Sequence, residues 1–295
     1  MPDLGRAVPA FVSVGTRELA AAAAIPIVLA ALFLAPPIVF NLLVAVLALG
    51  ALREFYRMAE ATGHPVAKTL GIVCGGLVLG DAAVLWGPIH FVTRSGVLID
   101  IAARQRPGGW FALVLLGVGL AALAPLFARL PPALALAGAS STAFGVLSIA
   151  LPATSLCYLR DHSPRSVLFL LLLVWVCDSA AYYVGRRFGA HLLAPVVSPK
   201  KTWEGSIGGF VAATLFGAAA GAWWLVPELG PIQGALAGAL ASTAGQLGDL
   251  VESLWKRGAG VKDSGTFLPG HGGIYDRIDS LLFAGPVVAG FLAWL

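Results

Sequence analysis

Long hydrophobic stretches follow one another along almost the whole chain, and short polar segments separate them. A helix that crosses the hydrocarbon core of a bilayer needs about 20 mainly apolar residues. The stretches that meet this requirement lie at roughly 19–35, 37–52, 69–86, 110–128, 133–157, 166–184, 207–226, 231–250 and 279–295. We therefore predict an all-α fold, a polytopic integral membrane protein with about nine transmembrane helices.

Two places in this pattern are open. Pro36 and Pro37 separate the first two stretches, which form either one bent helix or a tight hairpin of two helices. Residues 87–101 form either an interfacial helix or a loop.

The composition agrees with a membrane protein. Hydrophobic residues make up 58% of the 295 positions and charged residues only 12%, whereas soluble domains carry about 25% charged residues. The net charge of +4 suits an anionic bilayer surface or an anionic substrate without choosing between them. The three cysteines lack CxxC spacing, so neither a disulfide framework nor a cysteine-ligated metal is expected.

The distribution of Lys and Arg predicts the orientation. With nine spans and the N-terminus inside, 14 of the 19 basic residues fall on the inner side. The positive-inside rule therefore favours an N-in, C-out topology. Loops 185–206 and 251–278 then share the cytoplasmic side, where they can meet. We expect residues 166–295 to form the catalytic region and residues 1–165 to supply helices that pack and face lipid.

One acid interrupts the apolar stretch 166–184. A charge near the bilayer centre costs about 2.5–3.5 kcal/mol on insertion scales, so Asp178 is expected to face a polar cavity or a partner. The alternative is an acid near the helix end that pairs with Arg186 or Arg187.

Loop 185–206 combines cations with hydroxyls and glycines just before the next span. Free N–H groups and the helix dipole make such a position suitable for phosphate. This composition favours phosphate binding over a basic loop that only sets topology and contacts anionic lipid. Its candidate substrate-binding residues are Arg186, Arg187, Ser198, Lys200, Lys201, Thr202 and Glu204.

The segment 248–280 gathers acids, bases and glycines at two helix ends. Asp249, Glu252, Ser253 and Lys256 share one helix face, and Asp276 and Asp279 share another. Carboxylate ligands beside phosphate suit Mg2+, so the predicted metal ligands are Asp249, Glu252, Asp276 and Asp279. The catalytic candidates are Asp249, Asp276, Lys256 and His271, and the further substrate-binding candidates are Ser253, Arg257, Lys262, Gly272, Gly273 and Arg277.

Two points in this segment have alternatives. His271 is an acid, a hydrogen-bond donor or a structural residue. The whole segment is alternatively a salt-bridged loop beside the membrane, with pairs such as Asp249–Lys256 or Asp276–Arg277.

The segment SLWKRGAGVKDSGTFLPGHGGIYDRID at 253–279 resembles the signature of the phosphatidate cytidylyltransferases, the CDP-diacylglycerol synthases. Trp255 departs from the usual aliphatic residue but is also apolar. DSAAYYVGRRFG, SPKKTWEG and EFYRMA (54–59) are similar to further family blocks, whereas the first 170 residues match mainly in hydropathy. The matching signature residues are Ser253, Lys256, Arg257, Lys262, Asp263, Gly265, Leu268, Pro269, His271, Gly272, Gly273, Asp276, Arg277 and Asp279.

The resemblance implies an enzyme of phospholipid biosynthesis that condenses CTP with phosphatidic acid and yields CDP-diacylglycerol and pyrophosphate. It implies dependence on Mg2+, paired aspartates matched by Asp249 and Asp276, and a homodimer. We expect a bacterial inner-membrane enzyme with its active site facing the cytoplasm, and no nucleic-acid partner. The alternatives are a CTP-dependent transferase or kinase acting on another membrane lipid, and a transporter of a phosphorylated metabolite.

Overall fold

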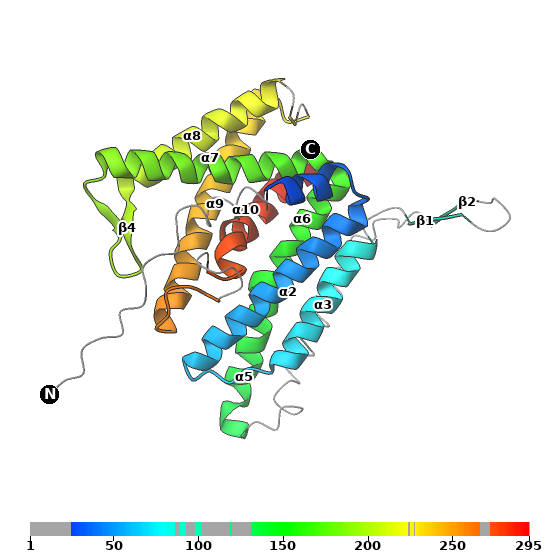
Figure 1. Ribbon diagram of the computed structural model, residues 1–295, viewed down its shortest axis with the longest axis vertical. Coiled ribbons are helices and arrows are strands. Elements are labelled where there is room, and N and C mark those ends of the chain that lie inside the picture. Colours follow the sequence, from blue (N-terminus) through cyan, green and yellow to red (C-terminus); the bar gives the residue numbers. More distant parts are fainter. Residues whose placement is uncertain are drawn as a thin grey trace.

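The computed structural model describes residues 25–85, 89–92, 98–101, 119, 131–223, 225–226, 228–265 and 272–294 (Figure 1). Helices dominate the described part of the chain, as the hydrophobic pattern predicts. After a short helix at 25–33 they are α2 (Pro37–Ala61), α3 (Lys68–Leu85), α5 (Pro132–Gly145), α6 (Leu151–His162), α7 (Pro164–Phe188), α8 (Trp203–Trp223), α9 (Gly230–Gly258) and α10 (Tyr275–Ala293).

The predicted spans coincide with helices wherever the structure describes them. Four helices are long and apolar enough to cross a membrane, namely Pro37–Ala61, Pro132–His162, Pro164–Phe188 and Trp203–Trp223. Predicted span 110–128 lies outside the described residues apart from Gly119. The fold is therefore that of an all-α membrane protein.

Prolines shape two of these helices. The helix at 25–33 ends before Pro36, and α2 begins at Pro37, so the first two hydrophobic stretches form separate helices. The π-helical turn η1 (Val146–Ala150) joins α5 to α6 just before Pro152. Because proline lacks an N–H and clashes with the carbonyl one turn earlier, a wider turn accommodates it without ending the helix.

The prediction of a helix or a loop at 87–101 was wrong for eight of these residues. Ile89–Val92 (β1) and Leu98–Ile101 (β2) pair as antiparallel strands, with Ile89 opposite Ile101 and Val92 opposite Leu98. Isoleucine, valine and phenylalanine favour extended backbone, and the paired strands satisfy each other's backbone groups.

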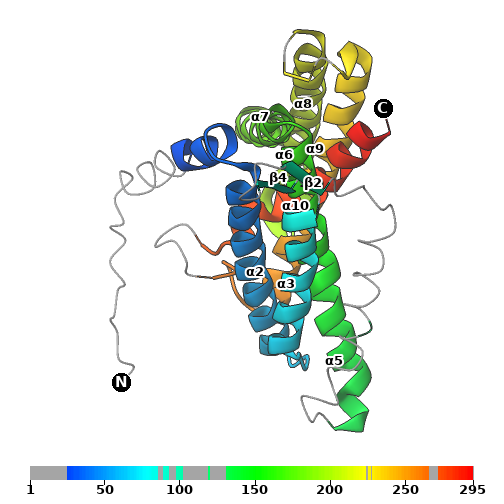
Figure 2. The same cartoon turned by 90° about the vertical axis from the view of Figure 1, so that its right-hand side faces the viewer.

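The helices form two groups that meet around α9 and α10. In Figure 1, α2, α3 and α6 run side by side, while α7 crosses the upper part of the molecule at a steep angle to them. Figure 2 shows α8 and α9 together at the top, above α2, α3 and α5. Helix α9 packs against both α8 and α10. The C-terminal half of α9 thereby reaches the centre of the molecule, where α10 begins.

Glycines bring α8 and α9 into backbone contact. A Cβ atom on Gly217 would overlap the carbonyl oxygen of Gly234, and a Cβ on Gly234 would overlap that of Gly217. A Cβ on Gly221 would likewise overlap the carbonyl oxygen of Gly230. Small residues allow this approach between helices in lipid.

Gly234→Leu should therefore separate α8 from α9 and lower the free energy of unfolding by about 3 kcal/mol or more, because backbone atoms cannot move aside as side chains do. Thermal unfolding in detergent measures the loss. Gly80→Leu is the matched control, since a Cβ at Gly80 of α3 meets nothing within 4 Å. Equal stability of the two variants would contradict the predicted helix contact.

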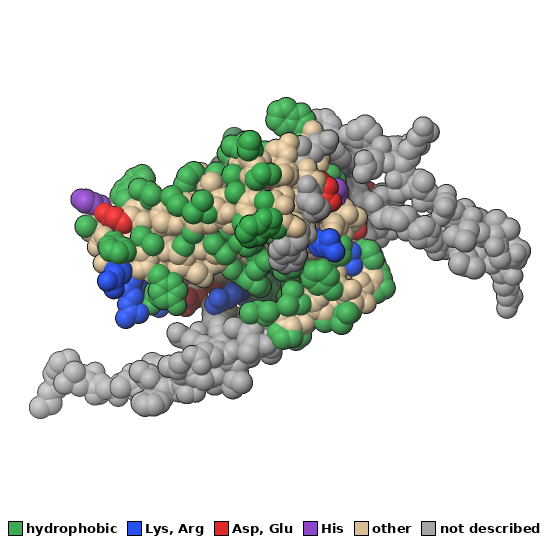
Figure 3. Space-filling view, turned by 90° about the horizontal axis from the view of Figure 1, so that it is seen from above, with side chains coloured by type: hydrophobic (Ala, Val, Ile, Leu, Met, Phe, Trp, Pro, Cys, Tyr) green, Lys and Arg blue, Asp and Glu red, His purple; other side chains and the backbone are tan. Residues whose placement is uncertain are grey.

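The outer surface is largely apolar, as expected for helices that face lipid. Large hydrophobic side chains are exposed along the candidate spanning helices, including Leu42 and Val46 of α2 and Leu215 of α8. The face seen in Figure 3 is covered mainly by hydrophobic and uncharged atoms, and its Lys and Arg side chains appear in only a few small groups. This distribution fits a bilayer-embedded body with polar ends.

Candidate active site

A two-stranded hairpin from loop 185–206 lies against the C-terminal half of α9. The strands are β3 (Leu192–Ala194) and β4 (Ser198–Thr202). Lys201 Nζ lies 2.5 Å from Asp249 Oδ2, and Arg257 Nε donates to the carbonyl oxygen of Val197 at 3.3 Å. The predicted meeting of the two polar loops is thus confirmed.

Local hydrogen bonds hold the hairpin at the start of α8. Thr202 Oγ1 accepts a hydrogen bond from the N–H of Gly205 at 3.2 Å, which is the geometry of a helix N-cap. Glu204 Oε2 accepts from the N–H groups of Ala190 and His191, and Glu204 Oε1 lies 2.6 Å from His191 Nδ1. Glu204, a predicted substrate-binding residue, therefore has its contacts within the hairpin.

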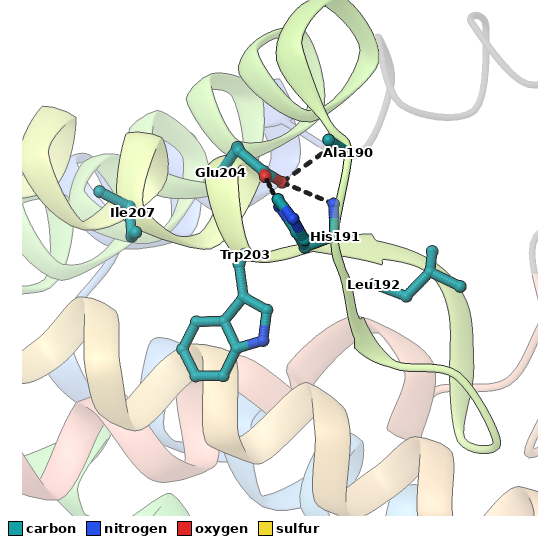
Figure 4. A pocket seen from close by; sticks show the side chains of 6 residues that line it. All are labelled: Ala190, His191, Leu192, Trp203, Glu204 and Ile207. Atoms are coloured by element: carbon teal, nitrogen blue, oxygen red, sulfur yellow. Dashed lines mark hydrogen bonds and ion pairs between the residues drawn. The ribbon is translucent and has the colours of Figure 1, made fainter.

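An open recess of about 810 Å³ lies between the hairpin and α8 (Figure 4). The His191–Glu204 pair sits beside the exposed ring of Trp203. A polar pair next to exposed apolar side chains is typical of a headgroup interface. The recess holds none of the predicted metal ligands; its lining is Ala190, His191, Leu192, Trp203, Glu204 and Ile207.

Three of the four predicted metal ligands come together between α9 and α10. One carboxylate oxygen from each of Asp249, Glu252 and Asp279 lies within 4.8 Å of the others. Asp249 and Glu252 are three residues apart on α9, so their side chains share one face. Three hard oxygen donors at this spacing fit a divalent cation such as Mg2+. We call these three residues the acid trio.

The fourth predicted ligand, Asp276, lies outside the acid trio. Its Oδ2 accepts hydrogen bonds from the N–H groups of Gly273 at 2.7 Å and Ser264 at 2.9 Å, and its Oδ1 lies 2.5 Å from Lys256 Nζ. Burial opposes ionisation, but these donors outweigh it and lower the pKa of Asp276 to about 2. Asp276 is thus an anion held by donors, and its role as a metal ligand stays a prediction.

Lys256 joins Asp276 to the acid trio, since its Nζ forms ion pairs with both Asp276 and Glu252. The side chain of Glu252 is only 1% exposed, and burial raises the pKa of Glu252 to about 9 although Lys256 opposes the shift. One lysine between two buried carboxylates neutralises only one of them. Burial thus disfavours the charged form of Glu252, whereas the donors around Asp276 favour its charged form.

Asp178 lies on α7, near this group. It interacts electrostatically with both Asp249 and Lys201. The arginines considered as its alternative partners are engaged elsewhere, because Arg186 donates to the hydroxyl of Tyr182 and Arg187 lies over the ring of Phe188. Among the described residues, the structure thus associates Asp178 with the predicted site and not with the end of its own helix.

The remaining predicted residues take varied positions. Ser253 Oγ lies 3.4 Å from Asp249 Oδ1. Gly272 adopts a φ of +79°, and the N–H of Gly273 is already donated to Asp276. His271 lies outside the described residues. Ser198 lies half-buried in β4, whereas Lys200, Arg257, Lys262 and Arg277 are exposed around the site.

Sequence reasoning did not single out Glu54, which the structure places against the loop between α9 and α10. Its carboxylate accepts hydrogen bonds from Ser264, Ile274 and Tyr275. A signal was present, because Glu54 is an acid at the end of an apolar stretch and belongs to the block EFYRMA. The first half of the chain thus contributes to the site.

Comparison with known proteins agrees with this arrangement. The model of the Cytidylyltransferase family matches residues 15–295. A phosphatidate cytidylyltransferase of Synechocystis is 33% identical over 279 residues, which cover 87% of this chain and 89% of the relative.

Sequence identity is higher in two shorter alignments. Enzymes of the same name from Staphylococcus saprophyticus and Brucella suis are 43% and 44% identical over 50% and 48% of this chain. The chain spans 57% and 53% of those two relatives. Because the family model covers nearly the whole chain and includes both halves of the site, this protein belongs to the Cytidylyltransferase family.

Proposed function

We propose that this protein is a CTP:phosphatidate cytidylyltransferase that makes CDP-diacylglycerol and pyrophosphate for phospholipid synthesis. The observation that carries the proposal is the family match over 15–295, which contains the acid trio and the lysines beside it. An oxygen of the phosphatidate phosphate attacks the α-phosphorus of CTP. One P–O bond forms to that oxygen, and the bond between the α- and β-phosphates breaks to release pyrophosphate.

The nucleophile needs little activation. The second pKa of a phosphate monoester is near 6, so phosphatidate is largely dianionic at neutral pH. A strong general base is therefore unnecessary, and the difficulty is the approach of two anions to each other. A site of this kind must supply positive charge where the phosphates meet.

Lys201 and Lys256 supply that charge from two sides. Each pairs with an acid, Lys201 with Asp249 and Lys256 with Asp276, so both ammonium groups are held at the junction of the hairpin, α9 and α10. Phosphate oxygens that approach this junction can share these donors, while Lys200 and Arg257 extend the positive charge outward.

Asp249, Glu252 and Asp279 are the residues that would hold Mg2+. The bound ion would orient the α-phosphate and stabilise the charge on the leaving pyrophosphate. Asp276, held by Lys256 and backbone N–H groups, fixes the start of α10 and thereby the position of Asp279 one turn later. We propose that Asp178 contributes further negative charge at the edge of the same site.

The proposed topology places this site at the cytoplasmic face of a bacterial inner membrane. Nine spans with the N-terminus inside put both polar loops on that face. Residues 166–295 then form the catalytic region, and the lipid keeps its acyl chains in the bilayer while its phosphate reaches the lysines. We also propose a homodimer, which cross-linking of the detergent-solubilised chain would test.

One assay tests the function. The purified chain in detergent is incubated with radiolabelled CTP, phosphatidate and Mg2+, and the products are separated. A labelled CDP-lipid together with pyrophosphate is the expected result. A phosphorylated lipid with CDP would instead indicate a lipid kinase, and no turnover would favour a transporter of a phosphorylated metabolite.

Lys201→Ala should weaken CTP binding far more than Lys200→Ala, although the two residues are neighbours. Lys201 forms an ion pair with Asp249, whereas Lys200 is exposed. Loss of a charge-assisted contact of about 1.5–3 kcal/mol corresponds to a rise in KM of roughly tenfold to a hundredfold. Steady-state kinetics on both variants measure it. If both lysines alter only membrane orientation, they serve topology and not substrate binding.

A further inference from the structure

A buried carboxylate in α2 lies far along the chain from the candidate site yet contacts it. Glu54 is only 6% exposed. Among the described residues no ion pair with Lys or Arg neutralises it. A buried charge without a counter-ion is costly unless hydrogen bonds compensate it. The contacts of Glu54 therefore indicate why an acid stands at this position.

Three donors surround this carboxylate, and all come from the junction of α9 with α10. Oε1 accepts from the N–H of Ile274 at 3.1 Å. Oε2 accepts from the N–H of Tyr275 and from the hydroxyl of Ser264, both at 2.9 Å. Since Ile274 and Tyr275 begin α10, Glu54 also lies at the positive end of that helix dipole.

Glycines make room for this carboxylate. A Cβ atom added to Gly265 or to Gly273 would overlap an oxygen of Glu54. Gly265 follows Ser264, and Gly273 precedes Ile274. The segments on either side of residues 266–271 therefore both contact Glu54. The side chain thereby joins two segments that are adjacent in space and separated in sequence.

Ser264 connects Glu54 to Asp276. Its hydroxyl lies 2.9 Å from Glu54 Oε2 and 2.9 Å from Asp276 Oδ2, and its N–H donates to the same Asp276 oxygen at 2.9 Å. Movement of Ser264 or of the first turn of α10 would therefore move Asp276. Asp279 of the acid trio lies one turn further along α10.

We infer that Glu54 is a positioning residue for cytidylyl transfer. It holds Ser264 and the start of α10 so that Asp276 meets Lys256 and Asp279 meets the other two acids of the trio. This inference rests on the proposed function for its kinetic consequence. Its structural consequence, protection of the backbone N–H groups of Ile274 and Tyr275, is independent of any activity.

Glu54→Gln tests the inference with little change in size. The amide presents an NH2 group where an oxygen now accepts, so at least one donor is left facing another donor. Glu60→Gln is the matched control, because Glu60 lies on the same helix and forms an exposed ion pair with Lys68. Ser264→Ala is a second variant that removes only the hydroxyl between the two carboxylates.

The kinetic readout separates positioning from folding. Loss of a residue that holds metal-binding side chains in place lowers affinity or activity by about 10- to 100-fold. Glu54→Gln should therefore lower kcat per folded enzyme by roughly that factor, with the KM for phosphatidate unchanged. Glu54 and Ser264 both act on Asp276 through the same hydrogen-bonded chain. The fall in kcat of the double variant Glu54→Gln/Ser264→Ala should therefore be smaller than the product of the two single falls. Glu60→Gln should keep the wild-type kcat.

Hydrogen–deuterium exchange of the full chain in detergent, without substrates, gives the second readout. Loss of a hydrogen bond to a charged group should speed exchange at residues 272–277 by about tenfold or more in Glu54→Gln and leave it unchanged in Glu60→Gln. A wild-type chain that makes no CDP-lipid would refute the proposed function, while the exchange comparison would still test the contacts of Glu54.

Two results would overturn the inference. The first is a Glu54→Gln protein whose exchange at 272–277 and whose kcat both equal those of Glu60→Gln. The second is a lower total activity explained entirely by less folded protein, with a normal kcat for the folded fraction, because Glu54 would then serve stability alone.

Discussion

Asp249→Asn should abolish Mg2+-dependent formation of CDP-lipid while the protein still inserts into the membrane. Asp249 belongs to the acid trio and also pairs with Lys201. The substitution therefore removes one negatively charged metal ligand and the acid that pairs with Lys201 of the hairpin. A lost metal ligand removes several kcal/mol of transition-state stabilisation, which corresponds to a fall in turnover of about a thousandfold. Asp276→Asn is expected to be as damaging.

Turnover across a Mg2+ titration measures this effect, and electron paramagnetic resonance of added Mn2+ reports ion binding without any turnover. Asp81→Asn in α3, outside the candidate site, is the control. Resistance of the membrane fraction to alkaline extraction checks insertion of each variant. Near-normal activity of Asp249→Asn at ordinary Mg2+ concentrations would refute the metal assignment, whereas near-normal activity of Asp276→Asn would refute the role of Asp276 in holding Lys256 and the start of α10.

Lys256→Met should destabilise the protein and also prevent turnover. Lys256 forms ion pairs with both Glu252 and Asp276, and the side chains of these acids are 1% and 11% exposed. Removing one partner of a buried ion pair leaves an uncompensated charge and costs about 3–5 kcal/mol in the free energy of unfolding. Thermal unfolding in detergent measures the loss.

Two comparisons sharpen this experiment. Lys68→Met removes a lysine from an exposed pair with Glu60, where the expected loss is only about 0–1 kcal/mol. Lys256→Met combined with Asp276→Asn removes the base together with the acid that is ionised, so the double variant should recover part of the stability but no turnover. A Lys256→Met protein as stable as wild type would show that Lys256 does not neutralise the buried acids.

The local sequence pattern predicts only part of the candidate metal site. Asp249 and Glu252 lie three residues apart on one helix, and helical spacing alone places them on one face. Their approach to Asp279 requires the packing of α9 against α10. Asp276 looked equivalent to Asp279 in the sequence, yet the turn at Gly273 directs it to Lys256 and to backbone N–H groups.

The partners in ion pairs could not be predicted from the local sequence pattern either. The pairs considered from the sequence were Asp249 with Lys256 and Asp276 with Arg277. Asp249 instead pairs with Lys201, 48 positions away, and Lys256 with Asp276. Periodicity reports which side chains share a helix face, but a partner on another element depends on how the elements pack.

The sequence by itself determined the helical membrane architecture, because long apolar stretches can satisfy their backbone groups in lipid only as helices. It also indicated the two loops in which the candidate site lies, since acids, bases and glycines gather there against an apolar background. Only the tertiary structure decided that Asp249, Glu252 and Asp279 form one group, that Lys201 joins it, and that Glu54 supports it. Those contacts join helices far apart in the chain, and long-range packing leaves no mark on local periodicity.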